Sequence, residues 1–156
     1  MIRFSVCLFL FSFFISCNSK KEILDEKELK DFKGYYTYFR RGAIMINSYD
    51  NLNNKCSPVI VYYTNNHIDS LSNKLNKFKT CRFDSLKIKL LSKKLLFLFS
   101  KYKITNISYN PNKNMSYGYW NPYYPDYVKF LNEDYKSKKL NLDKYKPIEN
   151  NWYELK

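Results

Sequence analysis

Residues 84–102 read DSLKIKLLSKKLLFLFSKY and predict the longest helix of the chain. Asp84 and Ser85 suit its start, because their side-chain oxygens accept hydrogen bonds from the first unpaired amide groups of a helix. The apolar residues that recur on one side at helical spacing are typical of a core-facing stripe: Ile88, Leu91, Leu95, Leu98, Phe99 and Tyr102. This stripe predicts that the helix packs on the core of a folded domain.

A second apolar stripe lies on nearly the opposite side of the same helix. It consists of Leu86, Leu90 and Phe97, and five lysines lie between the two stripes. A helix that is apolar on two sides is usually packed between other elements, and we expect that arrangement here. The alternative is that the second stripe and the lysines contact a membrane surface or a partner, as basic amphipathic helices do.

Segments rich in β-branched and aromatic residues predict strands on both sides of this helix. Residues 35–40 and 43–48 form a hairpin signal that turns at Arg41-Gly42. The remaining predicted strands cover 58–64, 104–109 and 115–120, and shorter helices are expected over 22–33, 67–79 and 126–135. This order predicts an α+β fold, namely a small single domain whose mostly antiparallel sheet has two or three helices packed on one face.

The N-terminus carries a separate signal. Arg3 is followed by an almost wholly apolar run over 4–15, which is shorter than the roughly 20 residues of a membrane-spanning helix. The tetrad Phe14-Ile15-Ser16-Cys17 resembles the lipobox of bacterial lipoprotein signal peptides. The resemblance covers this segment alone. It implies that residues 1–16 are removed and that Cys17 carries acyl chains such as palmitate; an uncleaved anchor and plain secretion are the alternatives.

The lipobox, the predicted elements and the polar composition of the last residues divide the chain into four predicted parts. Residues 1–16 are the signal peptide, 17–21 the lipidated cysteine with a short tether, 22–135 the α+β domain, and 136–156 a polar C-terminal tail in which Trp152 and Tyr153 are a docking point. Asn18 follows Cys17, in place of the aspartate that retains many lipoproteins in the inner membrane. By this resemblance we expect a cell-envelope protein anchored in the outer membrane.

Cys56 and Cys81 predict a disulfide, because exported proteins meet an oxidising environment. The strand 58–64 and the predicted helix 67–79 are each roughly 20 Å long, so an antiparallel pair returns Cys81 to Cys56. Two buried free thiols are the alternative. Asp69-Ser70-Leu71 and Asp84-Ser85-Leu86 also resemble a bacterial O-glycosylation acceptor, although Asp and Ser belong at helix starts in any case.

The 156-residue chain has a formal net charge of +13. A basic surface in the envelope favours anionic partners such as lipopolysaccharide, teichoic-type polymers or phospholipid headgroups. An AT-rich genome, which enriches Lys, Asn, Tyr and Ile, is the alternative explanation of this charge. Nucleic acid is not expected as a partner, because an exported lipoprotein does not meet it routinely.

Catalytic motifs do not stand out in the sequence. The single histidine, His67, lies in a polar turn, and no metal-ligand spacing, nucleophile motif or glycine-rich phosphate loop occurs. We therefore expect no enzyme activity, no metal and no cofactor. The carboxylates are scattered and would form a site only if the fold brought two of them together.

An aromatic segment over 117–127 is the strongest candidate binding site. Large rigid rings stack on sugars or form protein hot spots at low entropic cost, and Arg40 and Arg41 at the first hairpin turn could add an anion contact. The candidate rings are Tyr117, Tyr119, Trp120, Tyr123 and Tyr124. The alternative is that these rings close the open end of the core.

Three hypotheses remain. The favoured one is a structural or protein-interaction lipoprotein, which tolerates buried rings and expects an exposed apolar patch elsewhere. The second is a binding module for anionic glycan or lipid, which requires the rings to be exposed beside lysines. The third is an enzyme whose residues converge only in the fold, in a pocket with two carboxylates or with His67 and one carboxylate.

Overall fold

The structure is a computed structural model that describes residues 23–40, 42–73, 79–119, 125–139, 141 and 143–156. The predicted signal peptide, Cys17 and the predicted tether over 17–21 lie outside the described residues, and so do four candidate binding residues. These are Arg41, Trp120, Tyr123 and Tyr124.

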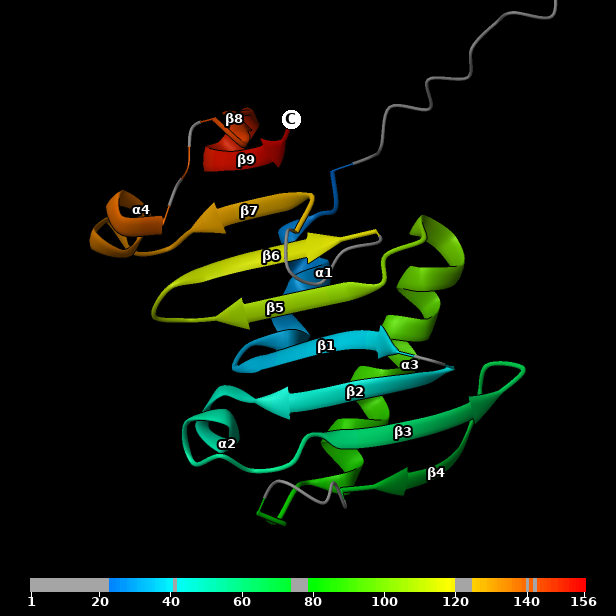
Figure 1. Cartoon of the computed structure of the whole chain (residues 1–156). Helices are drawn as coiled ribbons and strands as arrows, with labels where there is room; N and C mark the ends of the chain where they lie inside the picture. Colours follow the sequence, from blue (N-terminus) through cyan, green and yellow to red (C-terminus); the bar gives the residue numbers. More distant parts are fainter. Residues whose placement is uncertain (1–22, 41, 74–78, 120–124, 140, 142) are drawn as a thin grey trace, which may run out of the picture.

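Nine strands form one antiparallel sheet in the order β4-β3-β2-β1-β5-β6-β7-β9-β8 (Figure 1). The predicted α+β fold, with a mostly antiparallel sheet and helices packed on it, is confirmed. The predicted hairpin over 35–48 is present, the strands expected over 104–109 and 115–120 pair with each other, and all neighbouring strands are antiparallel. The strands are β1 (Tyr35–Arg40), β2 (Ala43–Ser48), β3 (Val59–Thr64), β4 (His67–Ser72), β5 (Asn106–Asn110), β6 (Asn114–Gly118), β7 (Tyr127–Phe130), β8 (Tyr145–Pro147) and β9 (Trp152–Leu155).

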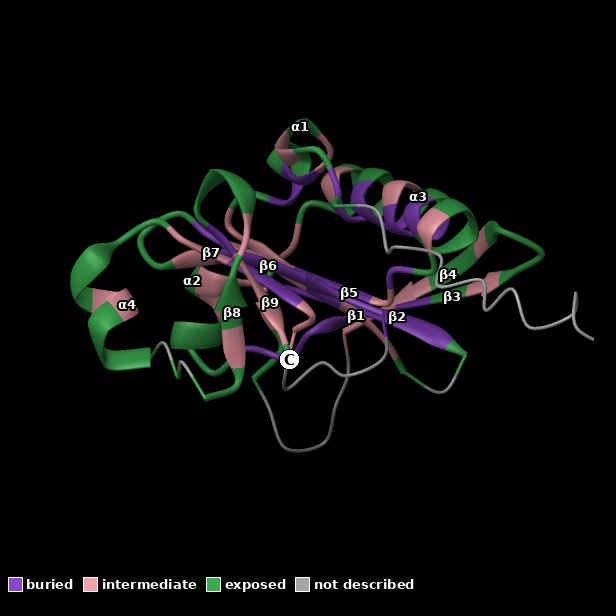
Figure 2. Ribbon diagram, turned by 90° about the horizontal axis from the view of Figure 1, so that it is seen from above, coloured by how far each residue is buried: buried purple, intermediate pink, exposed green. Residues whose placement is uncertain are grey.

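The helices are distributed unevenly over the two faces of the sheet. α3 (Ser85–Tyr102) lies beside α1 (Glu26–Leu29) and its short 3-10 extension η1 (Lys30–Phe32) on one face (Figure 2). α2 (Tyr49–Asn53) and α4 (Glu133–Lys139) lie at one end of the sheet, and the 3-10 turn η2 (Glu149–Asn151) precedes β9 (Figure 1). We call the face under α1 and α3 the helix-covered face.

α3 begins and ends as its sequence predicts. The Asp84 side chain accepts a hydrogen bond from the Lys87 amide at 2.9 Å, and Lys103 ends the helix in the left-handed region at φ 61°. The inner stripe packs on one half of the sheet, where Leu91, Leu95 and Leu98 are buried in one cluster with residues of β2 and β3.

The outer stripe of α3 corrects the expectation that both sides of this helix are buried. Leu86 is 68% exposed, Leu90 57% and Phe97 52%. In the described part of the chain the sheet covers only the inner side of α3, and no second layer lies above the helix (Figure 2).

The prediction of a helix over 67–79 is wrong in its first half, because residues 67–72 form β4. Ile68 and Leu71 are three apart, which resembles helical spacing. In the strand they reach the same face because the register shifts between Tyr62 and Tyr63, so that no residue of β3 is paired in register with Asp69. A β-bulge therefore imitates the helical period in the sequence.

The C-terminal third of the chain also differs from the prediction. The helix expected over 126–135 is strand β7 followed by α4, whose first turn is capped by the Asn132 side chain accepting from the Tyr135 amide at 2.8 Å. The segment 136–156, expected as a polar tail, adds β8 and β9 to the sheet. Trp152 is only 2% exposed, because this ring fills the core below α1.

The disulfide between Cys56 and Cys81 is present and confirms the sequence prediction. It closes the end of the β3–β4 hairpin instead of a strand–helix pair. The Ser57 amide donates to the Lys79 carbonyl at 2.9 Å beside it, so the two segments are joined by backbone as well as by sulfur.

Replacing both cysteines (Cys56→Ser with Cys81→Ser) should lower the free energy of unfolding by about 3.5 kcal/mol, because a closed loop of this size restricts the unfolded chain by roughly that amount. Urea denaturation followed by circular dichroism measures the change. Reducing the unaltered protein with dithiothreitol is the matched control and should give the same loss; an unchanged midpoint in both would contradict the prediction.

Candidate functional site

The structure places part of the candidate aromatic segment in the core. Tyr117 is 0% exposed and Tyr119 is 5% exposed. The Tyr117 ring lies 5.0 Å from the Tyr127 ring and 5.5 Å from the Trp152 ring, measured between centroids. These rings fill the core as the alternative interpretation proposed, and neither Tyr117 nor Tyr119 offers a ring face to a ligand.

The Tyr117 hydroxyl has a structural role at the start of the domain. It accepts a hydrogen bond from the Leu24 amide at 2.8 Å and thereby fixes the segment that leads into α1. Burial raises the pKa of Tyr117 well above its usual value of 10, so the phenol stays neutral at physiological pH. Tyr127 donates to Glu154 at 3.1 Å, and burial followed by the nearby carboxylate raises the pKa of Tyr127 in the same direction.

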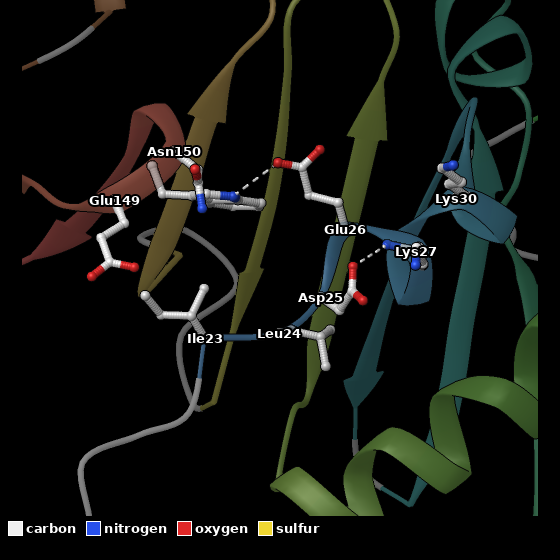
Figure 3. A pocket seen from close by; sticks show the side chains of 9 residues that line it. Ile23, Leu24, Asp25, Glu26, Lys27, Lys30, Glu149 and Asn150 are labelled. Carbon is white, nitrogen blue, oxygen red and sulfur yellow. Dashed lines mark hydrogen bonds between the residues drawn. The ribbon is translucent and has the colours of Figure 1, made fainter.

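A depression of about 550 Å³ lies between the N-terminal segment over 23–30 and the residues 149–152 that lead into β9 (Figure 3). Glu26 accepts hydrogen bonds from Trp152 at 3.3 Å and from the Lys129 ammonium. Asp25 accepts from the Lys27 amide at 2.9 Å. The remaining lining residues are Ile23, Leu24, Lys30, Glu149 and Asn150.

Two of the carboxylates that line this depression have structural partners. Asp25 caps α1, and Glu26 is the partner of Lys129 and Trp152. The lining also includes the exposed carboxylate of Glu149, and among the described residues it contains no histidine, cysteine or hydroxyl side chain. The described residues contain no group of three His, Cys, Asp or Glu side chains that would hold a metal ion. Within the same residues, no helix is long and apolar enough to cross a membrane. His67 is exposed at the start of β4.

A second surface lies on the face of the sheet opposite α3, and the strand register shows which side chains form it. The side chains of Tyr36 and Tyr38 point away from the helix-covered face, because the residues that alternate with them, Thr37 and Phe39, point toward it. The two rings lie 6.0 Å apart and nearly parallel, with an interplanar angle of 7°.

Two further tyrosines extend this surface. Tyr49 of α2 lies 6.1 Å from Tyr36, and its hydroxyl shares a short hydrogen bond with the Ser108 hydroxyl. Tyr62 of β3 is on the same side of the sheet and is 46% exposed. We call Tyr36, Tyr38, Tyr49 and Tyr62 the tyrosine face.

Small polar side chains flank Tyr36 and Tyr38 on the same side of the sheet, while the buried Met45 lies between Tyr38 and Tyr62. Asn47, Asn106, Asn110 and Ser116 are buried at its base. Asn47 donates to the Cys56 carbonyl at 3.3 Å, which ties the base of the face to the disulfide. Burial raises the pKa of Tyr36 and of Tyr49, so both phenols remain neutral hydrogen-bonding groups. Arg40 is exposed on the same side, at the end of β1.

Sequence reasoning did not identify the tyrosine face. In the segment 35–40 both alternating sets contain aromatic rings, so the pattern does not show which set faces the core. Phe39 shows which set faces the helices, because the centroid of its ring lies 4.7 Å from that of Phe99 on α3. Only the position of the helix therefore reveals that Tyr36 and Tyr38 lie on the other side.

The outer stripe of α3 forms a third surface. Lys101 lies over the rings of Phe97 and Tyr102, at 5.8 Å and 4.7 Å from their centroids. Lys94 instead contacts α1 and η1, with its ammonium 2.7 Å from Asp31 and 3.3 Å from Glu28. The two serines of the predicted glycosylation motifs, Ser70 on β4 and Ser85 at the start of α3, are both exposed.

Comparison with known proteins finds no matching family model, no similar curated protein and no similar solved structure.

Removing the buried hydroxyl with Tyr117→Phe should lower the free energy of unfolding by about 1–3 kcal/mol, because the Leu24 amide would then be buried without an acceptor. Urea denaturation measures the loss. Tyr109→Phe, on the same face of the sheet but half-exposed, is the matched control and should change stability by less than about 0.5 kcal/mol. An equal loss of unfolding free energy in the two variants would show that the hydrogen bond to Leu24 does not stabilise the fold more than a half-exposed hydroxyl does.

Proposed function

We propose that this chain is a lipid-anchored protein of the bacterial cell envelope and that it acts as a structural or protein-interaction component. The tyrosine face is its binding surface for a protein partner. The observation that carries the proposal is a sheet face lined by tyrosine rings and by asparagine and serine side chains, opposite the face that α1 and α3 cover (Figure 2).

The anchor is proposed from the sequence, and the disulfide supports an extracytoplasmic location. Phe14-Ile15-Ser16-Cys17 has the order of a lipobox. A Cys56–Cys81 disulfide persists in oxidising compartments and is rare in the cytosol. With Asn18 after the modified cysteine, the outer membrane is the proposed destination.

The composition of the tyrosine face favours a protein partner. Tyrosine offers a large, rigid and amphipathic contact area at low conformational cost, while serine and asparagine supply adaptable hydrogen bonds. Tyr36 and Tyr49 are neutral because burial raises their pKa. The side chain of Arg40 adds one positive charge at the rim, so this face suits an uncharged or weakly acidic protein surface better than an anionic polymer.

Binding of an anionic glycan or lipid is the second candidate function. The lysines that favour it lie on α3, on the other side of the sheet from the tyrosine face. The aromatic segment over 117–127 no longer supports it through Tyr117 or Tyr119, since both rings are buried.

The anchor is tested by metabolic labelling of cells with an alkyne analogue of palmitate. The unaltered protein should incorporate the label and fractionate with membranes, whereas Cys17→Ser should incorporate none, because the acylated sulfur is gone. Cys7→Ser, a cysteine inside the signal peptide, is the matched control and should keep the label. Absence of label from the unaltered protein would exclude lipid anchoring.

The partner is tested with a photoreactive amino acid placed at Tyr62 in the native host. We expect one discrete protein adduct, because Tyr62 is the most exposed ring of the tyrosine face. The same amino acid at Lys30, exposed on the helix-covered side, should give no such adduct, and Tyr38→Ala should weaken the Tyr62 adduct. An adduct of equal yield from Lys30, or a glycan adduct from Tyr62, would contradict a protein-binding tyrosine face.

A further inference from the structure

We infer that the outer stripe of α3, together with its flanking lysines, rests on the anionic phospholipid surface of the membrane that holds the anchor. The inference deepens the proposed function and rests on it, since it assumes that Cys17 is lipidated. It assigns a membrane-facing side to the domain and leaves the tyrosine face pointing away from the bilayer.

The outer stripe has the geometry of an interfacial helix. At 3.6 residues per turn, Leu86, Leu90 and Phe97 fall within an arc of about 40°. All three are more than half exposed, and the helix below them is held by its buried inner stripe. A preformed apolar stripe of this kind enters the headgroup region without any folding step.

The charges around the stripe complement an anionic surface. Lys89 and Lys93 are exposed on the same side of α3, and neither has an ion pair with a carboxylate among the residues that the structure describes. Lys101 lies over the Phe97 ring, which places its charge beside the most bulky apolar group of the stripe. Lysines arranged in this way hold phospholipid headgroups while the apolar residues enter between them.

The described part of the chain begins on the side of the sheet that α3 occupies. The chain from Cys17 reaches Leu24 after seven residues, a span of at most about 25 Å. Leu24 is held by the Tyr117 hydroxyl on the helix-covered face, and α1 beside it is bridged to α3 by the Lys94 contacts. A short tether that ends beside α1 therefore keeps α3 close to the bilayer.

The consequence is a fixed orientation. α3 and the tyrosine face lie on opposite sides of one sheet (Figure 2). When the outer stripe contacts the bilayer, the tyrosine face is turned toward the aqueous space and is accessible to a partner. Acyl chains alone would attach the domain but would leave it able to rotate.

The test uses the mature, lipidated protein reconstituted through its anchor into vesicles. Two variants each carry one thiol-specific fluorophore. In the first, the fluorophore is attached at Ser100→Cys, about one turn beyond Phe97 on the outer side of α3. In the second, it is attached at Ser70→Cys, on the opposite side of the sheet. Lipids with a nitroxide on the acyl chain quench a fluorophore that enters the headgroup region. We expect quenching of the Ser100 label on vesicles with phosphatidylglycerol, little on pure phosphatidylcholine, and none of the Ser70 label.

Charge reversal gives the matched variants. Lys89→Glu with Lys93→Glu should lower the ratio of docked to undocked protein at least about 25-fold, because each lysine near an anionic surface contributes about fivefold. Lys138→Glu with Lys139→Glu, the same charge change on exposed residues of α4, should leave quenching unchanged. Added salt should weaken the quenching in the unaltered protein, since it screens the lysines.

The outcomes separate this inference from the proposed function. If the protein does not float with the vesicles, the anchor is wrong and so is the proposal that rests on it. If it floats but the Ser100 label is not quenched on anionic vesicles, the anchor remains and the orientation is overturned. A photoreactive group at Ser100 that captures a discrete protein in cells, without quenching on vesicles, would make the outer stripe a protein interface and would also overturn the inference.

Discussion

The architecture depends on one long helix packing on a sheet that is much wider than the helix. The inner stripe of α3 covers β2 and β3, and the N-terminal segment closes the rest of the same face with Leu24, Leu29 and Phe32. The hydrogen bond from Leu24 to Tyr117 fixes that closure. These two covers lie on one face. In the part of the chain that the structure describes, the second face therefore has no helix of comparable length, and α3 keeps an exposed outer side.

These two exposed surfaces differ in chemistry as well as direction. The tyrosine face combines neutral rings with buried amide and hydroxyl groups, and Arg40 is exposed at its rim. The outer stripe combines leucine and phenylalanine with lysines. A domain with an apolar, basic side and a polar, aromatic side can contact a membrane with the first and a protein partner with the second. This difference between the two sides is the physical basis of both proposals.

Several features were predictable from sequence because they depend on local rules. The Asp84 cap and the inner stripe determine α3 from neighbouring residues alone. The first hairpin follows from its β-branched and aromatic strands and the turn at Gly42. The helix prediction over 67–79 failed at β4, since a bulge at Asp69 gives the spacing of Ile68 and Leu71 a helical appearance. The segment 136–156 looked like a tail because its strands are short and rich in polar residues. β9 joins the sheet by pairing with β7, and β8 joins it by pairing with β9.

The sequence by itself determined the α+β class, the long helix and the Cys56–Cys81 pair, because periodicity, capping and cysteine pairing are local or nearly local properties. Only the tertiary structure decided which aromatic residues are core and which are surface. Tyr117 and Tyr38 are equally good strand residues, but Tyr117 faces α1 and Tyr38 faces away from it. In a chain with 16 tyrosines, the side of the sheet on which the helices pack separates the two roles, and that choice depends on contacts between residues far apart in sequence.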